Sequence, residues 1–403
     1  MKNVKMLLIF IITSTLLLAS AQRVNSLGGN VGYWADDDNS WTAFPHTINN
    51  SNLAQVSGIG SDGNHNAIVR WGDGTKWGFS WNQANANDMI NLQWGNGSMG
   101  ATFGLSMSAS DNGLTGDNNM ATSGMGISAS WGQEMGFGEV GVGFSTSSYD
   151  DGDADSKNDP STMGLSVNLR RPQSLWIFDN MLVGFAYNSF NAVPVETWME
   201  DLGAEGPWTD GVADAITTME LSTSLYTHVD ISDNTTALIA MGFGYKSHVN
   251  GSYGAAGSTC DDMDSDDEGG CVADADGNGG VWVAAMPNYW MAAKGAASSW
   301  ISLPTWTFAV ESAMTDWATA RVGVNAGYNL MTSVETTGAS EAKAITGRGG
   351  METAFSVGLG FNYGSFNLDV DVSEGLFTNP VQHVTGFESI APNDATATLT
   401  YSW

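Results

Sequence analysis

The residues best suited to chemistry are oxygen ligands in the second half of the 403-residue chain. Asp274, Asp276 and Asn278, followed by Gly279, have the Asp-x-Asp-x-Asn-Gly spacing of the first half of a calcium loop. Carboxylate and amide oxygens at alternate positions suit a hard cation. Ala285 stands where a bidentate Glu would complete an EF-hand loop, and helical flanks are missing. The motif therefore predicts a structural Ca²⁺ at most, with a solvated acidic loop as the alternative.

The two cysteines of the chain, Cys260 and Cys271, lie just before this motif. They enclose a stretch in which 261–268 is mostly Asp and Glu. In an exported protein the compartment is oxidising, so a disulfide between them is expected. Two free thiols are the alternative.

Catalytic chemistry is not indicated by any motif. The five histidines, at positions 46, 65, 228, 248 and 383, lack metal-ligand spacing, and no Gly-x-Ser-x-Gly nucleophile motif accompanies them. We therefore expect that the protein is not an enzyme.

The charge of the chain excludes one class of partner. The chain carries 13 Lys and Arg against 43 Asp and Glu, a formal net charge of −30. Phosphate backbones require the opposite sign, so nucleic acid is not expected as a partner. An acidic secreted sandwich or propeller is one architecture compatible with this composition.

The elements that would position these residues are strands. Apolar and small or polar residues alternate along runs of about ten residues, as in 101–109, 163–170 and 355–363. A tilted strand of that length crosses a bilayer. Short turns are expected at 72–74, 95–98, 179–180, 232–234, around 316 and at 364–365. Long acidic connections are expected at 111–121, 150–161, 191–217, 250–298, 336–351 and 378–394. Strict alternation of short and long requires that 281–291 does not cross the membrane.

These runs predict the fold class and the domain organisation. The fold is all-β, an antiparallel up-and-down transmembrane barrel, because an open sheet would leave edge groups unsatisfied in lipid. With further strands at 52–60, 64–71, 75–82 and 87–95 the count is sixteen, and fourteen is the alternative. The expected division is a signal peptide at 1–21, a non-strand segment at 22–51 that plugs the lumen or lies on the periplasmic rim, and a barrel at 52–403 with a large outer loop at 250–298.

The polar face of the strands is the candidate functional surface. Small polar residues dominate it, and the charged or amide residues expected to line the pore are Arg170, His228, Asp230, Lys246, Asn362, Asp369 and Asp371. Excess Asp favours cations. The long 191–217 connection is a candidate constriction, with Glu196, Glu200, Asp201 and Asp210 as its acidic residues.

Both ends of the sequence point to export. Lys2 and Lys5, an apolar run and Ala19-Ser20-Ala21 have the pattern of a cleaved secretory signal. Leu399, Tyr401 and Trp403 form the apolar face of a last strand that stops on an aromatic residue. In these features the chain resembles Gram-negative outer-membrane β-barrels of porin-like size. The resemblance implies outer-membrane lipid and the barrel-assembly machinery as partners, with Leu399, Tyr401 and Trp403 as the assembly signal, and a homotrimer as one oligomeric state.

Three functions are compatible with these features. The favoured one is a porin-like channel for passive diffusion of small hydrophilic solutes and ions, with a mild cation preference. The first alternative is a lumen-blocked barrel that serves as a surface structural or adhesion protein. The second alternative is a transporter of hydrophobic compounds, for which apolar lumen residues are scarce.

Overall fold

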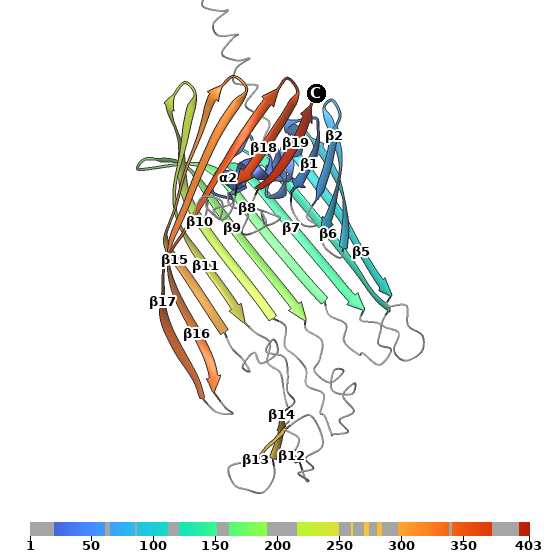
Figure 1. The fold of residues 1–403 in the computed structure, drawn as a ribbon, viewed down its shortest axis with the longest axis vertical. Coiled ribbons are helices and arrows are strands. Elements are labelled where there is room, and N and C mark those ends of the chain that lie inside the picture. The colour runs from blue at the N-terminus through green and yellow to red at the C-terminus, as the bar shows by residue number, and fades with distance from the viewer. Residues whose placement is uncertain are drawn as a thin grey trace, which may run out of the picture.

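The computed structural model forms a closed barrel of sixteen antiparallel strands (Figure 1). The structure describes residues 20–60, 65–84, 87–111, 121–150, 161–191, 216–249, 259–260, 270–273, 280–283, 297–337, 341–372 and 395–403. The predicted fold class and strand count of sixteen are confirmed. No helix in this described part of the chain is long and apolar enough to cross a membrane.

The barrel strands follow one another around the wall in sequence order, with β11 next to β15. The first eight are β1 (Leu53–Ile59), β2 (Asn66–Trp71), β3 (Thr75–Ala84), β4 (Asn87–Asn96), β5 (Met99–Asp111), β6 (Ala121–Met135), β7 (Gly138–Asp150) and β8 (Ser161–Leu175). The others are β9 (Phe178–Asn191), β10 (Ile216–Ser232), β11 (Thr235–Val249), β15 (Ala297–Thr315), β16 (Ala318–Thr337), β17 (Glu341–Tyr363), β18 (Phe366–Val372) and β19 (Ala395–Ser402).

The first and last strands close the barrel. In β1 and β19, Leu53 is opposite Ser402 and Gln55 is opposite Thr400. The Gln55 amide donates a hydrogen bond to Thr400 Oγ1 at 3.0 Å inside the barrel. Closure pairs the edges of the first and last strands with each other, as a sheet in lipid requires.

The outer face of the wall is apolar and exposed. Large side chains such as Leu92, Phe103, Trp306 and Phe308 lie on it with 43–56% of their surface accessible. In a soluble protein so many exposed apolar side chains would cause aggregation, whereas a lipid environment covers them. The molecule therefore has the architecture of a bacterial outer-membrane β-barrel.

From β4 to β16, two-residue turns alternate with longer connections, and two predicted boundaries are corrected. The turn predicted at Asp179 and Asn180 lies instead at 176–177, because both residues belong to β9, where Asn180 pairs with Pro172, and Trp176 adopts φ 58°. The predicted long loop at 336–351 is mostly strand, because backbone pairing of β16 and β17 continues to Thr337 opposite Glu341. Strand pairing depends on backbone hydrogen bonds and not on the alternation of apolar and polar side chains. The β16–β17 hairpin therefore continues past the residues that show this alternation.

Of the region predicted to leave the barrel wall, 281–291, the structure describes residues 281–283, and these lie outside the barrel sheet. β14 (Gly280–Val283) is the central strand of a separate sheet with β12 (Thr259–Cys260) and β13 (Gly270–Ala273). Cys260 is opposite Gly280 and Cys271 is opposite Trp282, so the cysteines occupy the two strands that flank β14. Two strand spacings, about 10 Å, exceed the roughly 7 Å between Cα atoms that a disulfide spans. The described backbone therefore does not support the predicted disulfide.

The segment before β1 is not strand. It contains the short helix α2 (Ala21–Ser26) and three 3₁₀ turns, η1 (Val31–Tyr33), η2 (Asp38–Thr42) and η3 (Pro45–Asn50). Ser20 caps α2 by accepting a hydrogen bond from the Arg23 amide. The asparagine Asn30 and the aspartate Asp37 cap η1 and η2 in the same way. Local capping therefore explains why this stretch turns repeatedly.

Candidate functional site

The N-terminal segment, defined as residues 20–50 and so including the last two residues of the predicted signal peptide, lies inside the barrel near the end with the short turns (Figure 1). α2 contacts β16, β17, β18 and β19, and η3 contacts β3, β4, β5 and β6. Between them, Tyr33 Oη donates to Ser224 Oγ of β10 at 3.0 Å, and the Gly32 carbonyl accepts a hydrogen bond from Arg170 of β8. The segment thus touches opposite sides of the wall and lies across the lumen.

Glycines on the inner wall make room for the segment. A Cβ added at Gly141 would lie 1.9 Å from the Ala43 carbonyl oxygen, and one at Gly100 would lie 2.1 Å from the Pro45 carbonyl oxygen. On the other side of the lumen, a Cβ at Gly358 would lie 1.9 Å from Ser26 Oγ. Backbone contacts this close exclude any larger residue. The wall is therefore shaped to receive this segment.

An apolar cluster fixes the middle of the segment against one side of the wall. Leu27, Tyr33, Trp34 and Phe44 of the segment are at most 6% exposed. Their wall partners are inward-facing apolar residues: Leu182 of β9, Tyr226 of β10, Leu238 and Ala240 of β11, and Ala309 of β15. Burying this surface stabilises the docked position through the hydrophobic effect.

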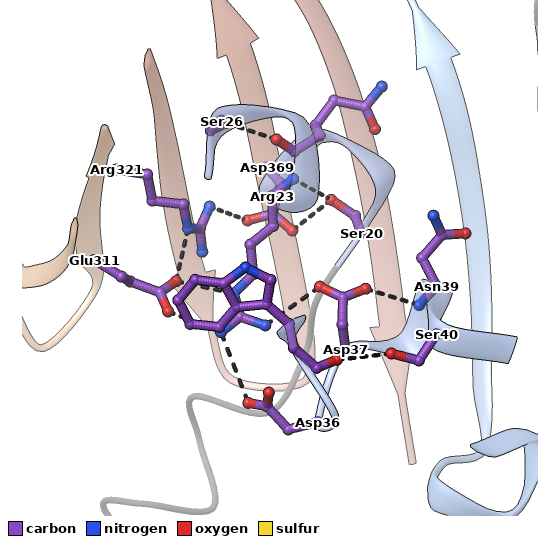
Figure 2. A network of polar contacts seen from close by, with 12 residues as sticks. Ser20, Arg23, Ser26, Asp36, Asp37, Asn39, Ser40, Glu311, Arg321 and Asp369 are labelled. Carbon is purple, nitrogen blue, oxygen red and sulfur yellow. Dashed lines mark hydrogen bonds and ion pairs between the residues drawn. The ribbon is translucent and has the colours of Figure 1, made fainter. Parts of the chain in front are cut away.

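A network of ion pairs joins α2 to β15, β16 and β18 (Figure 2). Glu311 accepts hydrogen bonds from Arg23 Nε and Nη2 at 3.0 and 2.8 Å, and from Arg321 Nε at 2.7 Å. Arg321 Nη1 also donates to Asp369 Oδ1 at 2.6 Å, and Ser20 Oγ donates to the second oxygen of Asp369 at 2.8 Å. Glu311 is thus the carboxylate that bridges an arginine of the segment and an arginine of the wall.

Carboxylates outnumber arginines in this network, and the pKa values of its segment residues reflect that. Burial alone would lower the pKa of Arg23, but the nearby carboxylates of Glu311, Asp36 and Asp37 raise it well above its usual value. Burial raises the pKa of Asp37 to about 8, although Arg23 Nη1 lies 3.3 Å from it and the Asn39 amide donates to it at 2.8 Å. Asp37 is therefore the group in the segment that takes up a proton near neutral pH.

Two further wall arginines hold the segment elsewhere. Arg170 of β8 pairs with Glu139 and lies over the Phe44 ring at 4.5 Å. Arg70 of β2 is fully buried, donates to the Asp38 carbonyl at 3.2 Å and lies 5.5 Å from the Trp41 ring centre. Arginine combines a fixed charge with a flat face that packs on aromatic rings. Each arginine therefore contributes both a polar and an aromatic contact to the segment.

Beyond the segment, toward the long connections, the described wall residues enclose polar-lined cavities. A cavity of about 780 Å³ lies against β8–β11, β15 and β16, and its lining includes Ser166, Asn168, Glu220, Ser222, Lys246 and Asn329. A second cavity of about 240 Å³ lies against β5–β9. Side chains this small leave space that water fills. The two halves of the lumen are therefore different: one contains these polar-lined cavities and is called the vestibule below, and the other is occupied by the N-terminal segment.

The predicted pore-lining residues divide between these two halves. Lys246 lines the vestibule. Arg170 and Asp369 are buried in contacts at the segment, His228 lies edge-on to the Trp34 ring, and Asp371 lies beside Ser26. Asp230, which accepts a hydrogen bond from Thr236, and Asn362 lie close to the short turns. The structure therefore does not bring the seven residues into one ring.

Other predicted residues are placed on the outer face or outside the described part. Leu399, Tyr401 and Trp403 are 39–55% exposed on the outer surface, and the Tyr401 and Trp403 rings stack at 5.7 Å. The constriction candidates Glu196, Glu200, Asp201 and Asp210, the calcium motif Asp274, Asp276 and Asn278, and residues 1–19 of the signal peptide lie outside the described residues. Among the described residues, no three His, Cys, Asp or Glu are grouped as metal ligands. The constriction, the calcium site and the signal peptide therefore remain predictions.

The sequence did not indicate most of the wall residues that contact the N-terminal segment. Arg70, Glu139, Glu311 and Arg321 hold or surround the segment, whereas the predicted residues that contact it are Arg170, His228, Asp369 and Asp371. One signal was present in the sequence. Leu182 and Leu238 are large apolar residues at inward positions whose nearest inward neighbours along the strand are small or polar: Asn180 and Gly184 for Leu182, Thr236 and Ala240 for Leu238. Such a break in the alternation indicates that something covers the wall at that point.

Comparison with known proteins gives only a general likeness. No family model matches the sequence, and no curated protein matches it. Among solved structures, the copper transporter OprC is 10% identical over 80% of this chain and 45% of its own, with a TM-score of 0.37. The siderophore receptor PirA from Acinetobacter baumannii is 8% identical over 80% and 61%, with a TM-score of 0.31. BamA from Haemophilus ducreyi is 9% identical over 87% and 70%, with a TM-score of 0.36. These similarities are too low to transfer a substrate or a functional residue.

Proposed function

We propose that this protein is an outer-membrane channel for small hydrophilic solutes, closed on the periplasmic side by its N-terminal segment. The observation that carries the proposal is the contrast between the two halves of the lumen. A vestibule of about 780 Å³ with a polar lining admits water, and residues 20–50 occupy the space that follows. Passage then requires the segment to move or rearrange, so diffusion is gated.

The character of the interface supports movement of the segment. Much of it consists of ion pairs and hydrogen bonds, such as Arg23 with Glu311 and Arg170 with the Gly32 carbonyl. Charged groups that leave such contacts are hydrated by lumen water, which offsets part of the lost interaction. A wholly apolar interface would gain no such favourable hydration when it opened.

A mild cation preference is part of the proposal. It is supported by the net charge of −30, since a field of that sign concentrates cations at the mouth of a channel. The wall itself contributes little, because Asp369 and Glu139 are paired with arginines and Glu220 of the vestibule is paired with Lys246. The preference would then come from acidic residues elsewhere in the chain.

A permanently blocked barrel with a structural or adhesive role is the second candidate. The observation that favours it is the extent of the contact, which runs from β16–β19 to β3–β6. In that case the lumen would never conduct.

Conductance in planar bilayers separates the two candidates. The full chain is expected to give infrequent or small current steps, and a variant that lacks residues 22–50 is expected to give larger and longer ones. Both proteins are first checked for barrel formation by their heat-dependent migration in gels. Absence of current steps from both folded proteins at every salt concentration would rule out the channel.

A further inference from the structure

The vestibule contains a hollow with the chemistry of a ligand site. The cavity of about 780 Å³ lies directly beyond the N-terminal segment, since its lining residue Asn168 reaches the Ala43 carbonyl at 3.5 Å. Sites for small molecules are commonly roughly 300–1,000 Å³ in volume. The cavity is therefore large enough for one small solute at the point where passage is closed.

Two rows of cross-strand neighbours form the hollow. In the outer row, Glu220 is opposite Lys246, and Lys246 is opposite Trp300. Directly opposite residues of an antiparallel pair share one face, so all three side chains face the lumen. In the inner row, Gly244 is opposite both Ser222 and Ser302, and Ser302 is opposite Asn329.

Small residues give the hollow its depth. Gly244 has no side chain, and the nearest atoms to an added Cβ there belong to Ser302, at 3.5 and 3.9 Å. The adjacent strand contributes Gly184 and Ala186 at the same level. Trp300, Lys246 and Glu220 are much larger and stand on one side of this floor. The shape is a shallow recess bounded by an aromatic ring and an ion pair.

The polar groups around the recess include donors and acceptors. Lys246 Nζ lies 2.6 Å from Glu220 Oε1, and with side chains 51% and 47% exposed both groups keep capacity for further hydrogen bonds. Ser302 and Asn329 add a hydroxyl and an amide and are hydrogen-bonded to each other. Among the lining residues of this cavity, Glu220 and Lys246 are the charged ones, so its net charge is zero.

These features select one chemical class of ligand. The recess has no net charge that would hold an ion, and a hydrophobic compound would desolvate the hydroxyl and amide groups. A sugar ring has an apolar face that can lie on the Trp300 indole and hydroxyl groups on its edge that match mixed donors and acceptors. We propose that the recess binds a neutral mono- or disaccharide. The proposal rests on the proposed function, because the sugar would be the solute that waits at the closed segment.

Calorimetric titration of the purified full chain in detergent tests this proposal, with glucose and maltose as probes. We expect saturable binding of at least one of them, and Trp300→Ala is expected to weaken it by about tenfold through loss of the aromatic contact. Gly244→Leu fills the recess and should weaken binding as well, and the space around Gly244 allows the barrel to fold. Trp306→Ala is the control, because Trp306 is on the same strand but 43% exposed on the lipid-facing surface.

The outcomes distinguish the sugar site from the channel. Absence of saturable sugar binding to the folded wild type, or equal loss in the Trp300 and Trp306 variants, would overturn the sugar site. Saturable binding of the zwitterion glycine betaine at the recess in place of sugars would overturn it too. None of these results alters the bilayer conductance that tests the channel. Conversely, sugar binding that depends on Trp300 in a protein without conductance would keep the site and remove the channel.

Discussion

Replacing Glu311 with alanine is the sharpest test of whether the ion network holds the N-terminal segment in place. The Glu311 side chain is 14% exposed and bridges Arg23 and Arg321, whose side chains are 3% and 5% exposed. Removing one partner of a buried pair costs about 3–5 kcal/mol, because the remaining charge is buried without compensation. The lower value applies here, since Arg23 keeps Asp36 at 3.7 Å and Arg321 keeps Asp369 at 2.6 Å.

A loss of about 3 kcal/mol changes the docking equilibrium by about two orders of magnitude. Amide hydrogen exchange measures this directly, because amides of 20–50 that exchange through undocking should lose about a hundredfold of their protection. Amides of the β16 and β17 ladder should be unchanged. The matched control is Glu220→Ala, which removes a carboxylate whose ion pair with Lys246 is half exposed and contributes at most about 1 kcal/mol. Unchanged protection of the segment in the folded Glu311 variant would refute the role given to the network.

Two further predictions concern the same interface. Gly141→Val should displace the segment and increase its cleavage by added protease, because a Cβ there would lie 1.9 Å from the Ala43 carbonyl oxygen. The control Gly327→Ala should have no effect, because the nearest atoms to its Cβ are at 3.7 and 3.8 Å. Equal cleavage of the two variants would contradict the steric argument. Because folding raises the pKa of Asp37 to about 8, its contribution to docking is complete at low pH and is lost as the pH rises from about 4 through 8. Exchange protection of the wild-type segment, corrected for intrinsic rates, should therefore fall by up to about tenfold per pH unit over that range, and Asp37→Asn should flatten this dependence. An equally steep dependence in the variant would assign the effect to another group.

The barrel could be predicted from the sequence because its determinants are local. A run such as 355–363 shows the period of two on its own, and a turn such as 364–365 is visible from its Gly and Ser. The docked segment depends instead on contacts between distant positions: Arg23 and Glu311 are 288 residues apart. Nothing near either residue identifies the other, so the sequence left open whether this stretch fills the lumen or follows the rim. Only the inward leucines at 182 and 238 indicated from the wall side that a cover was present.

The buried arginines explain how the N-terminal segment can close the lumen and still be able to move. In a strongly acidic chain, Arg23, Arg70, Arg170 and Arg321 are all buried where the segment meets the wall, on sides of the barrel as far apart as β2, β8 and β16. A buried ion pair adds little net stability over its hydrated parts, whereas removal of one partner is costly. The arginines therefore define where the segment sits more than how tightly it binds. The net affinity comes from the apolar cluster around Phe44, which is confined to one side of the lumen. The apolar contacts that bind the segment lie on one side of the lumen, whereas the arginine contacts that position it lie all around. The segment can therefore detach at α2 while it remains attached near β8–β11. Opening would then begin at the Arg23–Glu311 contact.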